Sequence, residues 1–355
     1  MKNPALYSNV SYLDTLLFTK HLAIMIKSGV PLLDAIDTLR GQTKSKAFEK
    51  ILAGIYEDAK NGQSLVVSLR KYPKVFNQFY ISLIEVGESS GTLEQNLEFL
   101  SSQLTKEYQL KKKMQGALLY PGLVISATIL MGGGITLFVL PKLVDFFASF
   151  EATLPLSTQI LLWIALVAKQ FGIVIAIGCI VLTIAMGIML QIPKIKYIWH
   201  SVMIKIPIFG ELLLDQELAR FSRNYGILLK SGISSTKGLE ITAKTVSNLR
   251  MQKDILMVAD MLSAGNSIGA TMMKEKFPEF PSMVTKMILV GEKTGKLENV
   301  LLYLGEYYEE EIENISKNLS TLLEPILLTV IGIIVGFMAL AIISPIYELT
   351  GSINK

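Results

Sequence analysis

The chain has 355 residues, of which 51% are hydrophobic and 18% are charged, whereas about 25% are charged in an ordinary globular domain. This balance excludes a disordered chain and argues against a wholly soluble one. The net charge of +4 is too small over this length to predict direct binding of nucleic acid. Cys179 is the single cysteine and there are two histidines, so we predict no disulfide framework, no metal and no cofactor.

The hydrophobic residues are concentrated in three runs without a charge, which cover residues 117–140, 171–190 and 325–347. About 20 apolar residues are enough for a helix to cross the hydrocarbon core of a bilayer. Each run therefore predicts one transmembrane helix. The first residues lack the charged-then-apolar order of a signal peptide, so we expect no cleavage there.

Basic residues beside the runs predict the orientation, because lysine and arginine next to a span tend to stay in the cytoplasm. More lysines follow the second run, whereas the loop between the first two runs has no basic excess. Three lysines directly precede the first run and act as topology determinants: Lys111, Lys112 and Lys113. We expect the N-terminus in the cytoplasm and the C-terminus outside.

A charge interrupts the apolar stretch that begins near Leu156. We interpret residues 156–168 as an interfacial helix whose neighbour, Lys169, reaches the lipid headgroups. The alternative is an intramembrane charge that serves transport. The predicted segments are a cytoplasmic helical domain (1–115), a transmembrane helix (116–141), an external loop with the interfacial helix (142–170), a second transmembrane helix (171–190), a second cytoplasmic helical domain (191–321), a third transmembrane helix (322–347) and an external tail (348–355).

The chain contains one pattern twice, which is the signature of an internal repeat. Residues 18–29 match residues 221–232, 203 positions later. Apolar residues recur at helical spacing in both copies, and no run alternates as a strand would. We therefore predict an all-α integral membrane protein with two repeated cytoplasmic helical bundles. Two further motifs follow in the same order in each copy: Gly-x-Ser-Leu/Ile from residues 62 and 265, and Val-Gly-Glu-x-x-Gly-x-Leu-Glu from residues 86 and 290.

The longer motif supplies the first candidate site residues. Gly91 and Gly295 predict a tight turn between two helices, since glycine tolerates the left-handed conformation. Glu88 and Glu292 have two interpretations, either as parts of a helix–helix turn or as solvent-facing side chains that contact a partner.

A proline stands near the start of the first and third apolar runs. Pro121 and Pro325 disturb the helix there, so we predict that they mark where each helix enters the membrane, together with Glu324. An acidic run at residues 306–313 precedes the third apolar run. It is either a solvated helix face or pairs with Lys111–Lys113 or another basic partner across the two repeats.

Catalytic motifs are missing from the sequence. It has no GxxxxGK[ST] phosphate loop, no HExxH and no GxSxG. Three glycines at 132–134 lie in an apolar run, where small residues favour close helix packing. We therefore predict that the protein is not an enzyme.

In kind and order, these motifs resemble the type II secretion system F family, which includes PilC-like platform proteins of type IV pilus machines. The resemblance extends from Phe18 to Tyr347 and includes Glu324-Pro325. It implies an oligomeric, non-enzymatic platform in the bacterial cytoplasmic (inner) membrane. The partners that it implies are a hexameric assembly ATPase, pilin or pseudopilin subunits, other inner-membrane machine components, membrane lipid and further copies of the chain.

Two other classes of function share some of these features. A membrane scaffold or receptor unrelated to secretion would have the same topology without contact to pilin or the ATPase. A transporter would also have internal repeats, but three spans with almost no polar groups argue against it.

Overall fold

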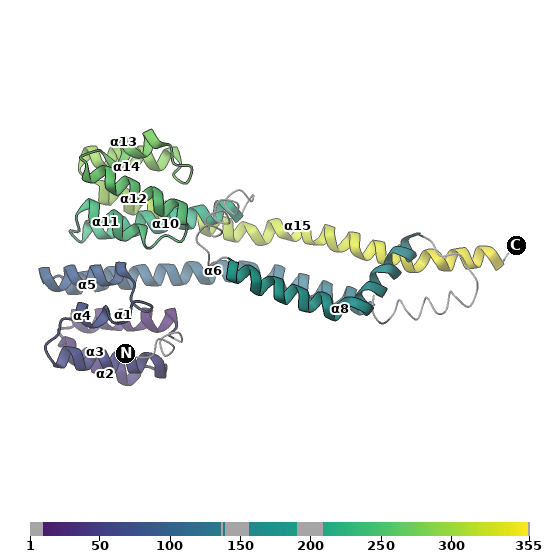
Figure 1. The fold of residues 1–355 in the computed structure, drawn as a ribbon, viewed down its shortest axis with the longest axis horizontal. Helices are drawn as coiled ribbons and strands as arrows, with labels where there is room; N and C mark the ends of the chain where they lie inside the picture. The colour runs from purple at the N-terminus through teal and green to yellow at the C-terminus, as the bar shows by residue number, and fades with distance from the viewer. Residues whose placement is uncertain (1–9, 136–137, 139–155, 190–208, 354–355) are drawn as a thin grey trace. The chain divides into compact units, whose positions relative to one another are not determined.

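The computed structural model describes residues 10–135, 138, 156–189 and 209–353. Every regular element in these ranges is helical, which confirms the predicted all-α class. The chain divides into two compact units (Figure 1). Unit 1 combines Met1–Lys112 with Tyr197–Glu313, and unit 2 combines Lys113–Lys196 with Asn314–Lys355.

Repeat one is the first half of unit 1. Its helices are α1 (Tyr12–Lys27), α2 (Leu32–Gln42), α3 (Lys46–Lys60), α4 (Leu65–Leu69), α5 (Gln78–Ser90) and the first part of α6 (Leu93–Gly134). Short polar side chains cap α1, α3, α4 and α5, where they satisfy free N–H groups at the helix start. Ser11 forms a capping box with Asp14 at α1, and Asn77 accepts a hydrogen bond from the Tyr80 N–H at α5.

Repeat two has the same order of helices. They are α10 (Phe209–Lys230), α11 (Ser235–Ala243), α12 (Leu249–Ser263), α13 (Ile268–Glu275), α14 (Ser282–Thr294) and the first part of α15 (Leu297–Ile353). Asn248 caps α12 and Ser267 caps α13 through their side chains. Ser234 stands at the N-cap of α11 without a side-chain hydrogen bond to the helix.

Aromatic side chains at equivalent positions lie in the interiors of both bundles. In repeat one the ring of Phe18 lies 5.7 Å from that of Phe48 and 6.3 Å from that of Phe76. In repeat two the Phe221 ring lies 5.2 Å from that of Phe280 in an edge-on arrangement. Such pairs add about 0.5–1.5 kcal/mol beyond the area that they bury, so the repeated phenylalanines are core residues.

The two repeats pack against each other within unit 1. The face formed by α5 and α6 of repeat one meets α10 and α11 of repeat two (Figure 1). Ile227, Leu228 and Ile241 of repeat two are buried and belong to the same hydrophobic cluster as the core of repeat one. Apolar burial of this kind is the main stabilising contribution to packing, so these three residues hold repeat two against the core of repeat one.

Unit 2 contains the C-terminal parts of α6 and α15 together with α8 (Leu156–Met189). α8 is a single helix, so the segment predicted to lie at the interface and the apolar run after Lys169 belong to one element. Over the described residues, no helix meets the length and hydropathy expected of a membrane-spanning helix. The predicted loop around residues 142–155 and the lysines that follow the second run lie outside the described residues.

Candidate functional site at the junction of the two repeats

Glu88, near the end of α5, binds the start of α4. Its carboxylate accepts hydrogen bonds from the Leu65 N–H at 2.7 Å and the Val66 N–H at 3.1 Å. These N–H groups have no partner inside the helix, and the positive end of the helix dipole favours a carboxylate there. Glu88 therefore joins the two sequence motifs of repeat one.

Glu292 does the same in repeat two. Its carboxylate accepts from the Ile268 N–H at 2.9 Å and the Gly269 N–H at 3.1 Å, and the Ser267 hydroxyl donates a third bond. Both glutamates are half-buried. The geometry supports the structural interpretation of the motif, because each carboxylate is occupied within its own bundle. Contact of these side chains with a partner stays a prediction.

The glycines of the motif have two separate roles. Gly91 and Gly295 adopt φ values of 71° and 67°, which places them in the left-handed region and ends α5 and α14. Gly87 allows close packing, since a Cβ there would lie 2.8 Å from the Leu93 Cα. The tight turn predicted for both repeats is therefore present.

An ion cluster joins the repeats at the base of the bundles. The Glu309 carboxylate on α15 binds the Arg223 guanidinium on α10 through two bonds, at 2.7 and 2.8 Å. The Lys106 ammonium on α6 donates to the same carboxylate at 3.1 Å. The Arg223 side chain is only 9% exposed, so its charge depends on Glu309 for compensation. The predicted pairing between the acidic run and a basic residue of repeat one is therefore present at Lys106.

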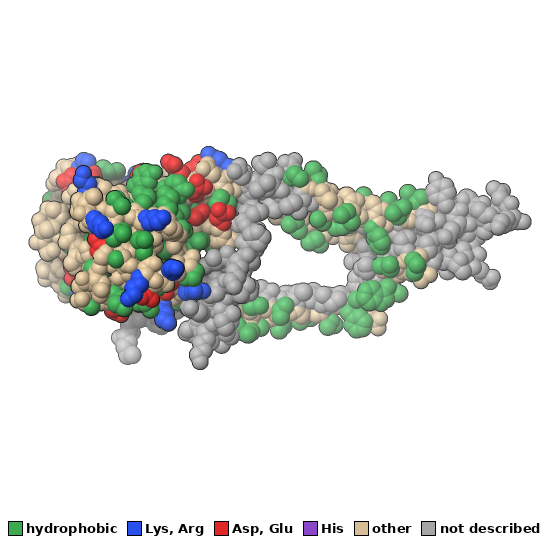
Figure 2. Space-filling view, turned by 90° about the horizontal axis from the view of Figure 1, so that it is seen from above, with side chains coloured by type: hydrophobic (Ala, Val, Ile, Leu, Met, Phe, Trp, Pro, Cys, Tyr) green, Lys and Arg blue, Asp and Glu red, His purple; other side chains and the backbone are tan. Residues whose placement is uncertain are grey.

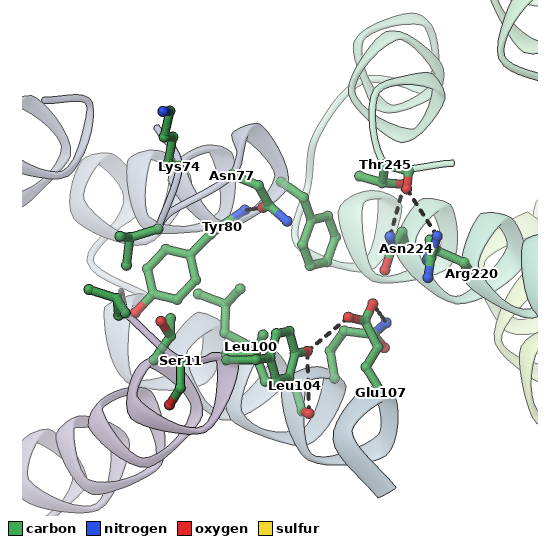
Figure 3. A pocket seen from close by; sticks show the side chains of 16 residues that line it. Ser11, Lys74, Asn77, Tyr80, Leu100, Leu104, Glu107, Arg220, Asn224 and Thr245 are labelled. Carbon is green, nitrogen blue, oxygen red and sulfur yellow. Dashed lines mark hydrogen bonds between the residues drawn. The ribbon is translucent and has the colours of Figure 1, made fainter. Parts of the chain in front are cut away.

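A cavity of about 410 Å³ lies between the repeats (Figure 3). On its α6 side, the Glu107 carboxylate accepts from the Tyr12 hydroxyl at 2.8 Å and from the Gln103 side chain at 2.9 Å. Burial and the Glu107 charge raise the pKa of Tyr12 above its usual range, so Tyr12 remains a proton donor. These polar groups give the junction a hydrogen-bonded lining.

The opposite wall of the cavity comes from repeat two. Asn224 donates to the Thr245 hydroxyl at 3.0 Å, and Arg220 donates to the Thr245 carbonyl at 3.5 Å (Figure 3). Arg220 also donates to the Ser247 hydroxyl at 2.9 Å. Oxygen atoms of Gln103 and Asn224 are buried here without a partner. Buried water commonly satisfies such groups, so the lining suits ordered water between the repeats.

The residues predicted at the membrane entry lie within long helices. Pro121 is in the middle of α6, and Pro325 and Glu324 are in the middle of α15. The Thr329 hydroxyl donates to the Pro325 carbonyl at 2.8 Å, the usual hydrogen bond of a helical threonine to the carbonyl four residues earlier. Their role in setting the position of the membrane stays a prediction.

The three predicted topology lysines form an exposed group on α6: Lys111, Lys112 and Lys113. The Lys112 ammonium lies 5.7 Å from the centre of the Tyr108 ring, a cation–π contact on the same helix. Their role as topology determinants stays a prediction.

The residues that sequence reasoning missed are those at the junction. The sequence does not single out Arg223 or Lys106, although the acidic run contains Glu309, the acidic partner of the ion cluster. Lys20 occupies the position in repeat one that Arg223 occupies in repeat two, so the repeat alignment alone could not show which basic residue is buried. In the described ranges, no group of three or more His, Cys, Asp or Glu side chains could hold a metal ion.

Comparison with known proteins finds the same two-part pattern. The family described as "Type II secretion system (T2SS), protein F" matches twice, over residues 18–141 and 221–345. Each match begins in the first helix of one repeat and ends in or after its long helix. The two matches coincide with the internal repeat found in the sequence.

Individual relatives cover nearly the whole chain. The type IV pilus assembly protein PilC of Myxococcus xanthus is 30% identical over 98% of this chain and 83% of that protein. PilC of Pseudomonas aeruginosa is 29% identical over 96% of this chain and 91% of its own length. The type II secretion system protein F of Pseudomonas aeruginosa is 28% identical, with coverage of 95% and 82%. The predicted resemblance is confirmed: the chain belongs to the type II secretion system protein F family.

Proposed function

We propose that this protein is the inner-membrane platform of a type IV pilus or type II secretion machine. The observation that carries the proposal is the double family match, which covers both helical bundles and the long helices that follow them. Relatives named for type IV pilus assembly and for type II secretion match over almost the full chain. The protein's part in such a machine is therefore structural.

The proposed topology has three transmembrane helices, with both bundles in the cytoplasm and the C-terminus outside. Its support is the three uncharged runs in the sequence and the lysines that flank them. In this arrangement α6 and α15 connect each bundle to the membrane. A movement of the bundles would then be transmitted along two continuous helices.

The proposed mechanism is mechanical rather than catalytic. A cytoplasmic hexameric ATPase supplies the energy, the two bundles receive the motion, and the membrane helices guide pilin or pseudopilin subunits. The apolar contacts between the two repeats and the ion cluster at Glu309 support this proposal, because they join the two bundles. A force applied to either bundle would reach both long helices.

Photo-crosslinking in living cells tests the proposed partners. A photoreactive amino acid replaces Val67 on α4, Met273 on α13 or Leu328 on α15, all of which are exposed. We expect capture of the ATPase from the first two positions and of pilin-like subunits from the third. The same substitution at Ile55, which is fully buried, is the negative control. Recovery of neither partner from cells that assemble the fibre would favour an unrelated scaffold.

Cysteine labelling tests the proposed topology independently. In a chain whose single cysteine is removed by Cys179→Ser, new cysteines replace Thr38 on α2 and Ser352 at the end of α15. A thiol reagent that does not cross membranes should label position 352 in intact cells and position 38 only after lysis. The reverse pattern, or labelling of both in intact cells, would contradict the topology.

A further inference from the structure

The two repeats meet through faces that are not equivalent. Repeat one contributes α5 and α6, whereas repeat two contributes α10 and α11, which correspond to α1 and α2 of repeat one. The Lys230 ammonium on α10 lies 5.4 Å from the centre of the Phe99 ring on α6. A junction between two different faces is head-to-tail. Each repeat therefore has a second face that takes no part in the junction, and we call this face its unused half.

The unused half of repeat one is a stripe on α1. In α10, residues Arg223, Asn224 and Ile227 are buried at the junction. Their counterparts on α1 are all exposed: Lys20, His21 and Ile24. The contrast is clear for the isoleucines, because Ile227 is 5% exposed and Ile24 is 53% exposed. The stripe has the spacing of one helix face.

The unused half of repeat two is on α14 and α15. Phe79 on α5 is 4% exposed, whereas its counterpart on α14, Met283, is 41% exposed. Val290, further along the same face, is 57% exposed, and Tyr303, the counterpart of Phe99, is 54% exposed. Figure 2 shows hydrophobic side chains gathered on one face of this unit with acidic side chains grouped beside them. Large exposed apolar groups on one face are typical of a docking surface.

We propose that the α14–α15 face of one chain binds the α1–α2 face of a second copy, in the same head-to-tail manner as the internal junction. Each chain carries both halves of this contact, so a second copy is the partner that supplies the matching surface. The inference rests on the exposed faces of unit 1 and not on the proposed function.

The charges of the two faces are complementary. Lys20 on α1 takes the place of Arg223, and exposed Glu310 on α15 takes the place of Lys106. On the other helix pair, exposed Lys286 of α14 corresponds to Ser82 of α5, while exposed Asp34 of α2 corresponds to Lys237 of α11. In the proposed contact, Lys20 would therefore face Glu310, and Lys286 would face Asp34. Such complementarity selects the orientation of an interface.

One contact of the internal junction has counterpart residues on these two faces. Lys27 corresponds to Lys230, and Tyr303 corresponds to Phe99. A lysine over an aromatic ring contributes about 0.5–1 kcal/mol at an exposed site.

Disulfide crosslinking of the full chain in native membranes tests the proposal. Two tagged forms, both carrying Cys179→Ser, are produced together, one with Ile24→Cys and the other with Tyr303→Cys. Oxidation should give a mixed dimer that contains both tags. Matched controls use two tagged forms with the same cysteine, and they should crosslink at least tenfold less. Crosslinking of 303 with 303 as strong as that of 24 with 303, or no crosslinking in any pair, would overturn the proposal.

A charge exchange sharpens the test. Lys286→Asp is added to the form that carries Tyr303→Cys. It should reduce the yield of the mixed dimer several-fold, since the new aspartate would face Asp34 of the other form. Adding Asp34→Lys to the other form should restore the yield. If Lys286→Asp has no effect, or if the second change does not restore crosslinking, the proposed register of the two faces is wrong. Neither result depends on whether the chain serves a pilus machine.

Discussion

The two repeats of this protein have the same helices in the same order but use their surfaces differently. Glu88 and Glu292 hold the start of α4 and α13 in the same manner. In contrast, the first helix of repeat one exposes a face whose counterpart in repeat two is covered at the junction. The comparison indicates that contacts inside a bundle are maintained by shared residues, whereas the outer faces are specialised for what they contact.

The interiors of the repeats also differ at a few positions. Repeat two buries Asp254 and Glu279 side by side, where the corresponding residues of repeat one are Ile51 and Val75. Gly269 of repeat two takes the place of Val66, which is buried in repeat one. Substitution of one repeat's residue into the other therefore tests which differences each bundle tolerates.

The largest effect is expected from Gly269→Val, which places the residue of repeat one into repeat two. A Cβ at this position would lie 2.4 Å from the Leu289 Cα, so α13 and α14 would have to separate. We expect the substitution to destabilise repeat two by about 3 kcal/mol. Hydrogen–deuterium exchange of the full chain should show faster exchange of peptides from residues 268–294.

Peptides from repeat one provide an internal control in the same experiment and should keep their protection. Gly41→Ala is a matched control variant, because a Cβ at Gly41 meets no atom within 4 Å. Unchanged exchange of residues 268–294 in Gly269→Val would show that the close approach of α13 and α14 is not a structural requirement.

The second prediction concerns the ion cluster at the junction. Arg223→Ala leaves Glu309 with Lys106 alone and removes a buried guanidinium, so we expect a loss of about 2–3 kcal/mol in the free energy of unfolding. The equivalent change in repeat one, Lys20→Ala, should alter the free energy by no more than about 0.5 kcal/mol. Thermal unfolding of the purified chain in detergent, at low protein concentration, measures both.

If Lys20→Ala lowered the free energy of unfolding as much as Arg223→Ala, the covered face of α10 and the exposed face of α1 would not differ as proposed. Exchange of peptides from α6 and α10 should accelerate in Arg223→Ala and not in Lys20→Ala. This second readout separates a local opening of the junction from a general loss of stability.

The third prediction compares the two glutamates that bind helix starts. Glu292→Ala should cost about 2–3 kcal/mol and Glu88→Ala about 1–2 kcal/mol, since Glu292 accepts three hydrogen bonds and Glu88 accepts two. Exchange at the first amides of α13 and α4 measures each loss locally. Glu85→Ala, which removes an exposed ion pair with Arg70, is the control.

The same variants separate the two interpretations of the motif. If pilus output and ATPase binding are unchanged where the bundles remain folded, the glutamates have no part in partner recognition. Loss of ATPase binding without faster exchange would instead support a direct contact.

The smallest effect is expected from Asp254→Asn and appears as a change in pH dependence. Burial, and then the neighbouring Glu279 carboxylate, raise the pKa of Asp254 to about 7 from an ordinary value of 3.8. Between these values the folded chain holds a proton that the unfolded chain has released, so stability falls as the pH rises through this window. The asparagine variant should therefore lose less stability than the original chain between pH 5 and pH 8.

Melting temperatures at the two pH values measure this difference, which we expect to be about 2–4 °C. Asp260→Asn on the exposed face of the same helix is the control and should leave the slope unchanged. The same slope in Asp254→Asn as in the original chain would contradict a buried proton at this position.

Most of the helical plan could be predicted from local patterns. The glycines at 91 and 295 and the serines at 64 and 267 mark helix ends through backbone geometry and hydrogen bonding over a few residues. The order of the motifs also identified the family.

Local patterns are enough to predict the helices, their repetition and the family, because each of these depends on spacing within one stretch of chain. Only the tertiary structure shows that Glu88 binds the start of α4 and that Glu309 pairs with Arg223 and Lys106. Those contacts join residues that are far apart in the chain, and a basic residue stands at the position of Arg223 in both repeats, since its counterpart in repeat one is Lys20. Which of them is buried depends on how the bundles pack, since only packing removes a side chain from water and makes its ionic partner necessary.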